Sequence, residues 1–131
     1  MKPMVVLATI CVTGVAAAGA LGASSSLNPG VYSTKITGSK IAPLNGSWML
    51  ALNGPAFTLI RNKVTAVAGA STIVAGKITF RDLAGPYRCT GTQASGTYKW
   101  TLKSKTLTFK PVSDSCAGRK SVLAHKFTKI A

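Results

Sequence analysis

From about residue 31 onward, the chain alternates between short runs of apolar and polar residues and clusters of turn-forming residues. In Lys77-Ile78-Thr79-Phe80-Arg81, the two apolar side chains fall on one side of an extended chain and the three polar ones on the other. Such runs, separated by Gly, Asn, Pro and Ser, are typical of an all-β domain. We expect strands at 31–37, 47–52, 56–61, 63–67, 72–75, 77–81, 96–103, 105–110 and 121–128, and no sustained helix.

The alternation is clearest in the two strands predicted at 96–103 and 105–110, which Lys103-Ser104-Lys105 would join as a tight hairpin. One face of this pair is apolar, and the other carries Lys and Thr. A ligand inside the fold would have to lie against the apolar face. The candidate ligand-binding residues are therefore Tyr98, Trp100, Leu102, Leu107 and Phe109, together with His125 on the last predicted strand.

So many short strands in about 100 residues would leave unpaired edges unless the sheet closes on itself. A single antiparallel up-and-down barrel of about eight strands removes the edges. The interior of such a barrel is filled by side chains or is just wide enough for one small ligand. A β-sandwich fits the same alternation. Residues 31–131 have the length of one small domain.

The first 23 residues differ from the rest of the chain. Lys2 precedes an apolar run rich in Ala, Gly and Val, and serines follow at 24–26. This pattern predicts a signal peptide at 1–23, cleaved near Ala20 or Ala23, and a secreted or extracytoplasmic protein. The alternative is an uncleaved N-terminal membrane anchor, because the run has about the length that a bilayer requires. Residues 24–30 are predicted to be a linker.

Cleavage would remove Cys11 and leave Cys89 and Cys116 as an even pair in an oxidising compartment, where we expect them to form a disulfide. They lie 27 residues apart, and closing that loop stabilises a fold by about 3 to 4 kcal/mol. Two distant cysteines and a single histidine are a poor set of metal ligands. We therefore expect no metal and no cofactor.

The chain is strongly basic. With Lys2 removed, 15 of its 16 Lys and Arg residues remain against only Asp82 and Asp114. Such a protein is attracted to polyanions, which outside a cell include wall polymers, anionic lipids and nucleic acid. The basic residues are scattered along the chain, and most aromatic residues alternate with the lysines onto the opposite face. We therefore do not expect the exposed stacking platforms of a nucleic-acid-binding barrel.

The residues offer little for catalysis. There is one histidine, there are two carboxylates, and Gly-x-Ser-x-Gly is absent, so we do not expect an enzyme. Asp114 is expected to cap a turn by accepting a backbone N–H near Cys116. Asp82 is expected to do the same or to pair with Arg88. The functional alternative is a buried carboxylate that orients the amine or hydroxyl of a ligand.

Leu44-Asn45-Gly46-Ser47-Trp48 resembles the Gly-x-Trp motif that begins an early strand in the calycins, the group that includes lipocalins, fatty-acid-binding proteins and avidins. The resemblance implies that Trp48 plugs the closed end of the barrel. It also implies that a basic residue from near the C-terminus packs across the indole. Arg119 is the candidate, and such a stack would contribute about 0.5 to 2 kcal/mol.

The second half resembles small secreted bacterial proteins with lipocalin-like barrels. The matching segments are Ile78-Thr79-Phe80-Arg81-Asp82, Cys89, Gly96-Thr97-Tyr98-Lys99-Trp100, Leu107-Thr108-Phe109 and Asp114-Ser115-Cys116-Ala117-Gly118-Arg119. The hairpin Lys103-Ser104-Lys105 departs from the Gly with Asp or Asn usual in that group. These relatives share no activity, so the resemblance implies a scaffold and no reaction.

The sequence thus predicts a secreted, monomeric, non-enzymatic binding module. It would hold a small apolar or amphipathic ligand in the barrel, or a protein partner at its loops. The alternative is a cationic structural protein of the cell envelope that binds anionic polymers around a solid barrel.

Overall fold

Eight antiparallel strands follow one another in chain order around a closed barrel, and the last strand pairs with the first. The computed structural model describes residues 27 and 29–131, so the predicted signal peptide at 1–23 and most of the predicted linker lie outside the described residues. The up-and-down barrel is confirmed, and the sandwich alternative is wrong. The strands are β1 (Gly30–Ile36), β2 (Gly46–Asn53), β3 (Ala56–Arg61), β4 (Val64–Val74), β5 (Lys77–Ala84), β6 (Ser95–Lys103), β7 (Thr106–Ser113) and β8 (Phe127–Lys129).

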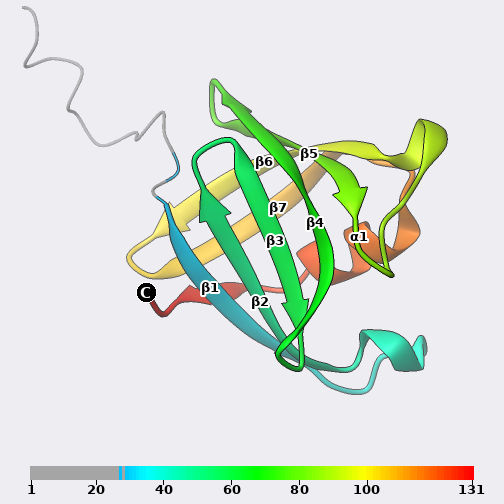
Figure 1. Cartoon of the computed structure of the whole chain (residues 1–131). Coiled ribbons are helices and arrows are strands. Elements are labelled where there is room, and N and C mark those ends of the chain that lie inside the picture. Colours follow the sequence, from blue (N-terminus) through cyan, green and yellow to red (C-terminus); the bar gives the residue numbers. More distant parts are fainter. Residues whose placement is uncertain (1–26, 28) are drawn as a thin grey trace, which may run out of the picture.

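The two ends of the barrel are built differently (Figure 1). The β2–β3, β4–β5 and β6–β7 hairpins lie at one end, together with the start of β1 and the C-terminus. The other end carries the longer connections: the turn η2 (Ala42–Leu44), the β5–β6 loop with η3 (Gly91–Gln93), and helix α1 (Ala117–Leu123) between β7 and β8. We term it the helix end. Long loops on a rigid scaffold are where binding sites are usually built.

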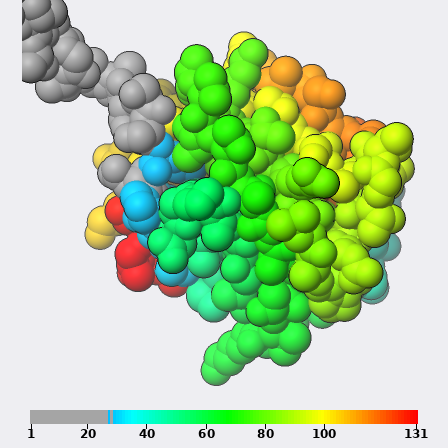
Figure 2. Space-filling view, turned by 45° about the horizontal axis from the view of Figure 1, so that its top comes forward, coloured from blue at the N-terminus to red at the C-terminus, as the bar shows by residue number. Residues whose placement is uncertain are grey.

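The predicted strands at 63–67 and 72–75 form one long strand, β4, so their separation was wrong. Gly69, which lies between them, does not end the strand but lies where the register of β4 against β5 shifts. A Cβ at Gly69 would lie 1.9 Å from the carbonyl oxygen of Arg81. This glycine therefore permits a bulge and a close approach of two backbones. The β4–β5 hairpin projects from the body of the barrel (Figure 1, Figure 2).

The predicted strand at 121–128 is also wrong, because its first three residues belong to α1 and only the short β8 at its end is extended. The buried residues of α1 are Arg119, Val122 and Leu123, which have the i, i+3, i+4 spacing of one helix face. Among the described residues, no helix has both the length and the apolar character needed to cross a membrane.

Aromatic rings in edge contact fill the middle of the barrel. The ring centroid of Phe80 lies 4.9 Å from that of Phe57, 6.0 Å from that of Tyr98 and 5.8 Å from that of Phe109. Phe109 in turn lies 6.1 Å from Phe127. Tilted ring pairs at these distances add to the stabilisation from apolar burial. The centre of the barrel is therefore held by packing.

Two segments at the hairpin end of the barrel bear on the sequence predictions: the residues before β1 and the β6–β7 hairpin. Leu27, which falls in the predicted linker, is 5% exposed and belongs to the core cluster. The connection from Lys103 to Lys105 is the tight hairpin that the sequence predicts, with Ser104 in the left-handed region at φ 54°.

Candidate functional site

A small hollow of about 110 Å³ lies at the helix end, between the barrel and α1. Its apolar walls are formed by Leu44, Trp48, Leu59, Val67 and Val122. Asp82 and Arg119 are its charged residues, and Tyr87 and Gly118 complete the lining. The last two are exposed, so the hollow reaches the surface. We term it the helix-end hollow.

Trp48 is placed on the wall of this hollow by the start of β2. Its side chain is 2% exposed, and the indole Nε1–H donates a hydrogen bond of 2.8 Å to the carbonyl of Leu44. Gly46 has φ 138°, and a Cβ there would lie 2.7 Å from Oδ1 of Asn62. That same oxygen accepts the backbone N–H of Ser47 at 2.9 Å. The glycine of the Gly-x-Trp motif is therefore required by this close approach.

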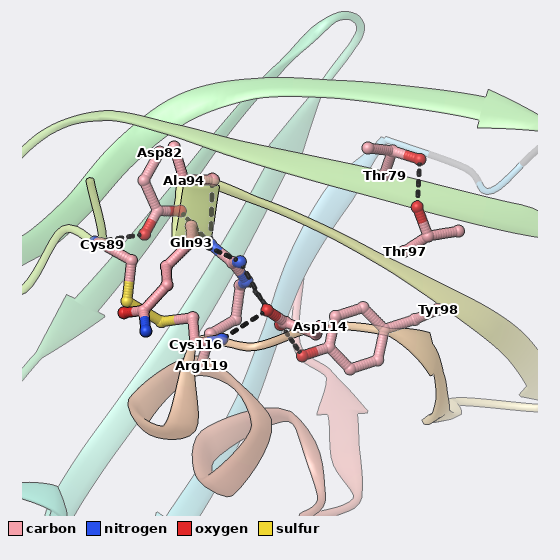
Figure 3. A network of polar contacts seen from close by, with 10 residues as sticks. All are labelled: Thr79, Asp82, Cys89, Gln93, Ala94, Thr97, Tyr98, Asp114, Cys116 and Arg119. Carbon is pink, nitrogen blue, oxygen red and sulfur yellow. Dashed lines mark hydrogen bonds and ion pairs between the residues drawn. A yellow bond between two sulfur atoms is a disulfide. The ribbon is translucent and has the colours of Figure 1, made fainter. Parts of the chain in front are cut away.

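Arg119 is buried and ties three segments together (Figure 3). Its Nε and Nη2 donate to the two carboxylate oxygens of Asp114, both at 2.7 Å. Nη1 and Nη2 donate to the carbonyls of Ala94 and Gln93, at 3.1 and 2.9 Å. Nη1 also lies 3.0 Å from Oδ1 of Asp82. One guanidinium thus joins the end of β5, the η3 loop and the segment before α1.

Asp114 receives more donors than Arg119 supplies. The hydroxyl of Tyr98 donates to Oδ2, and the backbone N–H of Cys116 donates to Oδ1 at 2.9 Å, which is the predicted turn cap. A Cβ at Gly96 would lie 2.4 Å from the carboxyl carbon, so only glycine leaves room there for Asp114.

These contacts shift three ionisations. Burial acts to raise the pKa of the Asp114 carboxyl, but the hydrogen bonds from Arg119, Tyr98 and Cys116 outweigh it, and the pKa lies below its ordinary value. Burial acts to lower the pKa of Arg119, yet the hydrogen bond to Asp114 and the charges of both aspartates raise it. Burial and the hydrogen bond to Asp114 raise the pKa of Tyr98. At neutral pH these shifts keep Asp114 ionised, Arg119 charged and the phenol of Tyr98 neutral.

Asp82 lines the hollow together with Arg119. Its side chain is 2% exposed, and Oδ2 accepts the backbone N–H of Cys89 at 2.8 Å. Oδ1 is attracted by the charge of Arg119 but has no hydrogen bond from any described residue. An anionic oxygen beside an apolar hollow can accept a hydrogen bond from a bound group.

The predicted disulfide between Cys89 and Cys116 is present, with Cα atoms 6.2 Å apart. It joins the β5–β6 loop to the start of α1 and lies next to the side chain of Asp82 (Figure 3). Both sulfur atoms lie close to the Asp82 carboxylate, but each is bonded to the other. Because a metal ligand must be a free thiolate, this group of three residues does not make a metal site while the disulfide is intact.

The predicted ligand-binding residues do not line the helix-end hollow. Tyr98, Leu107 and Phe109 are buried in the core, and Trp100 and Leu102 pack against it half-buried. His125 is exposed just after α1, because its segment is not the strand that the sequence predicts. The side chains that the sequence predicts to bind a ligand therefore mainly form the packed core of the barrel.

The structure also gives the positions of the predicted structural residues. Arg119 and Trp48 both line the helix-end hollow, and the guanidinium is held by carboxylates and carbonyls. The suggested pairing of Asp82 with Arg88 is wrong. Arg88 donates to the carbonyl of Gly85 at 3.1 Å, and Asp82 pairs with Arg119 from beyond the next two strands.

Sequence reasoning missed most of the walls of the hollow. Leu59 and Val67 alternate inward on β3 and β4 like any core residue, so they carried no distinguishing signal. Val122 and Leu123 lie three and four residues after Arg119, which is the spacing of one helix face, and this spacing was the sequence signal for Val122. Tyr87 follows Gly85-Pro86 in a loop, and an aromatic residue in such a place is a usable sign of a binding surface.

The fold and this site define a small all-β protein: a closed eight-stranded antiparallel barrel, consistent with a calycin-like fold, with a buried ionic network under one end. Comparison with protein families, with curated proteins and with solved structures finds no match.

Proposed function

We propose that this protein is a secreted, calycin-like binding module whose helix-end hollow holds one small apolar group that carries a hydrogen-bond donor. The observation that carries this proposal is Oδ1 of Asp82, which lies beside apolar walls and forms an ion pair with Arg119 but accepts no hydrogen bond from a described residue. A hydroxyl or ammonium group on the ligand would donate to this oxygen while the rest of the group displaces water from Trp48, Leu59 and Val122.

The size of the hollow limits the ligand. An engineered apolar cavity of about 150 Å³ accepts benzene, and the helix-end hollow measures about 110 Å³. It therefore suits a branched chain of about four or five carbon atoms or a small ring. A larger amphipathic molecule would insert such a group and leave its remainder outside, over Tyr87.

Export and a non-enzymatic role are parts of the same proposal. The composition of residues 1–23 and a disulfide, which persists in oxidising compartments, support export. The non-enzymatic role is supported by the structural use of both aspartates, which pair with Arg119 inside the fold.

The test uses isopentyl alcohol and its methyl ether, which has a similar apolar body but no donor. Binding is followed by the NMR signals of the two indole N–H groups. We expect the alcohol to shift the Trp48 signal in a saturable way and to leave that of Trp100 unchanged. The ether should bind about fivefold more weakly or worse, because it leaves the Asp82 oxygen buried without a donor.

Val122→Phe should fill the hollow and abolish the shift, whereas Val112→Phe adds the same ring at an exposed position of β7 and should not. Leu59→Phe fills the hollow from the opposite wall and serves if Val122→Phe does not fold. An alcohol that shifts neither indole up to its solubility limit, or that binds the filled variants unchanged, would contradict the proposal.

A further inference from the structure

Three lysines lie side by side on the outer wall of the barrel. Lys77 on β5 is directly opposite Lys99 on β6, and Lys99 is directly opposite Lys110 on β7. All three are exposed, and we term them the lysine row. Neighbouring strands are about 4.8 Å apart, so the three side chains leave the sheet at about that spacing. Like charges placed directly opposite each other destabilise a sheet.

No acidic side chain in the described residues relieves this repulsion at the surface. Asp82 and Asp114 have side chains that are 2% and 0% exposed, and both are held by Arg119. Among the described Lys and Arg residues, only Arg119 is buried. The outer charges of the barrel are therefore positive, and the lysine row is the place where the sheet register aligns three of them.

Hydroxyl groups lie on both sides of the lysine row. Thr79 and Thr97 are paired across β5 and β6, with their Oγ1 atoms 2.9 Å apart (Figure 3). Thr101 and Thr108 are paired across β6 and β7. Threonine hydroxyls can donate hydrogen bonds to anionic oxygens. The strands are held in place from within, because one chain neighbour of each lysine, namely Ile78, Tyr98 and Phe109, is buried in the core.

Among the residues that the structure describes, this face offers no exposed ring for a nucleic-acid base. Phe80, Tyr98 and Phe109, the aromatic residues of these strands nearest to the lysine row, are buried inside the barrel, and Trp100 packs against that core. Proteins that bind single-stranded nucleic acid combine positive charge with exposed aromatic rings on which bases stack. A polymer bound here would therefore be recognised through its charged backbone and not through stacked bases.

We propose that the outer face of β5, β6 and β7 binds a flexible linear phosphate polymer through the lysine row. Successive phosphates would each neutralise one lysine and accept hydrogen bonds from the flanking threonines. The open wall favours an extended chain over a single anion, because a single anion needs donors that converge on it. This surface shares no residue with the helix-end hollow, so the two proposals are independent.

The experiment measures binding of the full-length chain to linear polyphosphate as a function of salt concentration. The row variant, Lys77→Gln/Lys99→Gln/Lys110→Gln, is compared with a control of equal charge, Lys35→Gln/Lys63→Gln/Lys120→Gln. The control lysines are exposed on β1, in the β3–β4 turn and on α1, and none is directly opposite another in the sheet. We expect the row variant to bind more than tenfold more weakly at low salt. Its slope of log K against log salt should fall by about 2, since each neutralised phosphate contributes about 0.7. The control should lose less than threefold.

Two further measurements make the result decisive. The melting temperature of the row variant without ligand should be no lower than that of the wild type, because the substitution removes repulsion between neighbouring lysines. An oligothymidylate with the same number of phosphates should bind no more tightly than polyphosphate. Equal losses in the two triple variants would show that only net charge matters, and tighter binding of the oligonucleotide would show that bases are recognised. Either result, or the absence of binding at low salt, overturns the proposal.

Discussion

Replacing Arg119 with methionine tests whether the buried network holds the helix end together. Met keeps most of the apolar stem of Arg but removes the donors to Asp114, to the carbonyls of Gln93 and Ala94, and the charge opposite Asp82. Removing one partner of a buried ion pair costs about 3 to 5 kcal/mol. The side chains are at most 2% exposed, so solvent does not screen this loss. We therefore expect Arg119→Met to lower the free energy of unfolding by about 3 to 5 kcal/mol. The total free energy of unfolding of a domain is about 5 to 15 kcal/mol.

The loss should depend on pH. In the wild type, burial acts to raise the pKa of Asp114, but the hydrogen bonds from Arg119, Tyr98 and Cys116 bring it below the ordinary value. The stabilisation it provides is present above the unfolded-chain pKa of about 3.9 and is lost as the pH falls through the lower folded-state pKa. In the variant, burial remains without the guanidinium, so we expect the folded-state pKa to rise. The difference in stability between the two proteins should therefore shrink between about pH 5 and pH 3.

Urea unfolding followed by tryptophan fluorescence measures both effects. Arg88→Met is the control, because this exposed arginine makes one hydrogen bond to Gly85 and should cost less than about 0.5 kcal/mol. Adding Asp114→Asn to Arg119→Met removes the uncompensated charge, so the double variant should be less destabilised than the sum of the single ones by about 1 kcal/mol or more. A loss below about 1 kcal/mol at pH 7, or a loss that does not change in acid, would refute the reasoning.

Two more predictions concern the same end of the barrel. Gly96→Ala places a methyl group where the Asp114 carboxylate lies and should lower the free energy of unfolding in urea by about 2 kcal/mol or more. Gly118→Ala is the control: the added methyl group meets open space in α1, so it should be neutral or stabilise by up to about 1 kcal/mol. Equal effects of the two substitutions would contradict this account of Gly96. Replacing both Cys89 and Cys116 with alanine opens a loop of 27 residues and should lower the free energy of unfolding in urea by about 3.5 kcal/mol. An unchanged urea midpoint would show that the loop is held in place without the disulfide.

The sequence predicts the barrel wall well because alternation is a local signal. Prediction from the sequence fails where the conformation of a residue is determined by a contact with a residue that is distant in the chain. Gly69 has the composition of a turn, yet it lies within β4 because the backbone of Arg81 approaches too closely for a Cβ. The alternation of Leu123, His125 and Phe127 suggests a strand, but the turn capped by Asp114 and the disulfide at Cys116 precede a helix that ends at Leu123.

The candidate site shows the same limit more strongly. Asp82 was expected to cap its turn or to pair with Arg88, which is near in sequence. It does accept the backbone N–H of Cys89, but the arginine that it pairs with, Arg119, lies on α1. The hollow that they share with Trp48 is formed by residues from β2, β3, β4 and α1, and no local pattern can bring these together. The Gly-x-Trp motif was expected to close one end of the barrel, and Trp48 instead forms one wall of the hollow at the helix end. The motif itself is a short-range signal, because Gly46 and Trp48 are constrained by contacts close to the start of β2.

The placement of the two aspartates links the interior of the barrel to its surface. A chain with only two carboxylates could have used them to relieve repulsion among its many exposed lysines, but both are turned inward to satisfy Arg119. Exposed ion pairs contribute little to stability, whereas a buried arginine without partners costs several kcal/mol. Burying both aspartates therefore holds the β5–β6 loop and α1 over the hollow, and it leaves the lysine row without a neutralising partner from its own chain. A bound polyanion would supply that partner, so its affinity should survive any substitution in the hollow that preserves the fold.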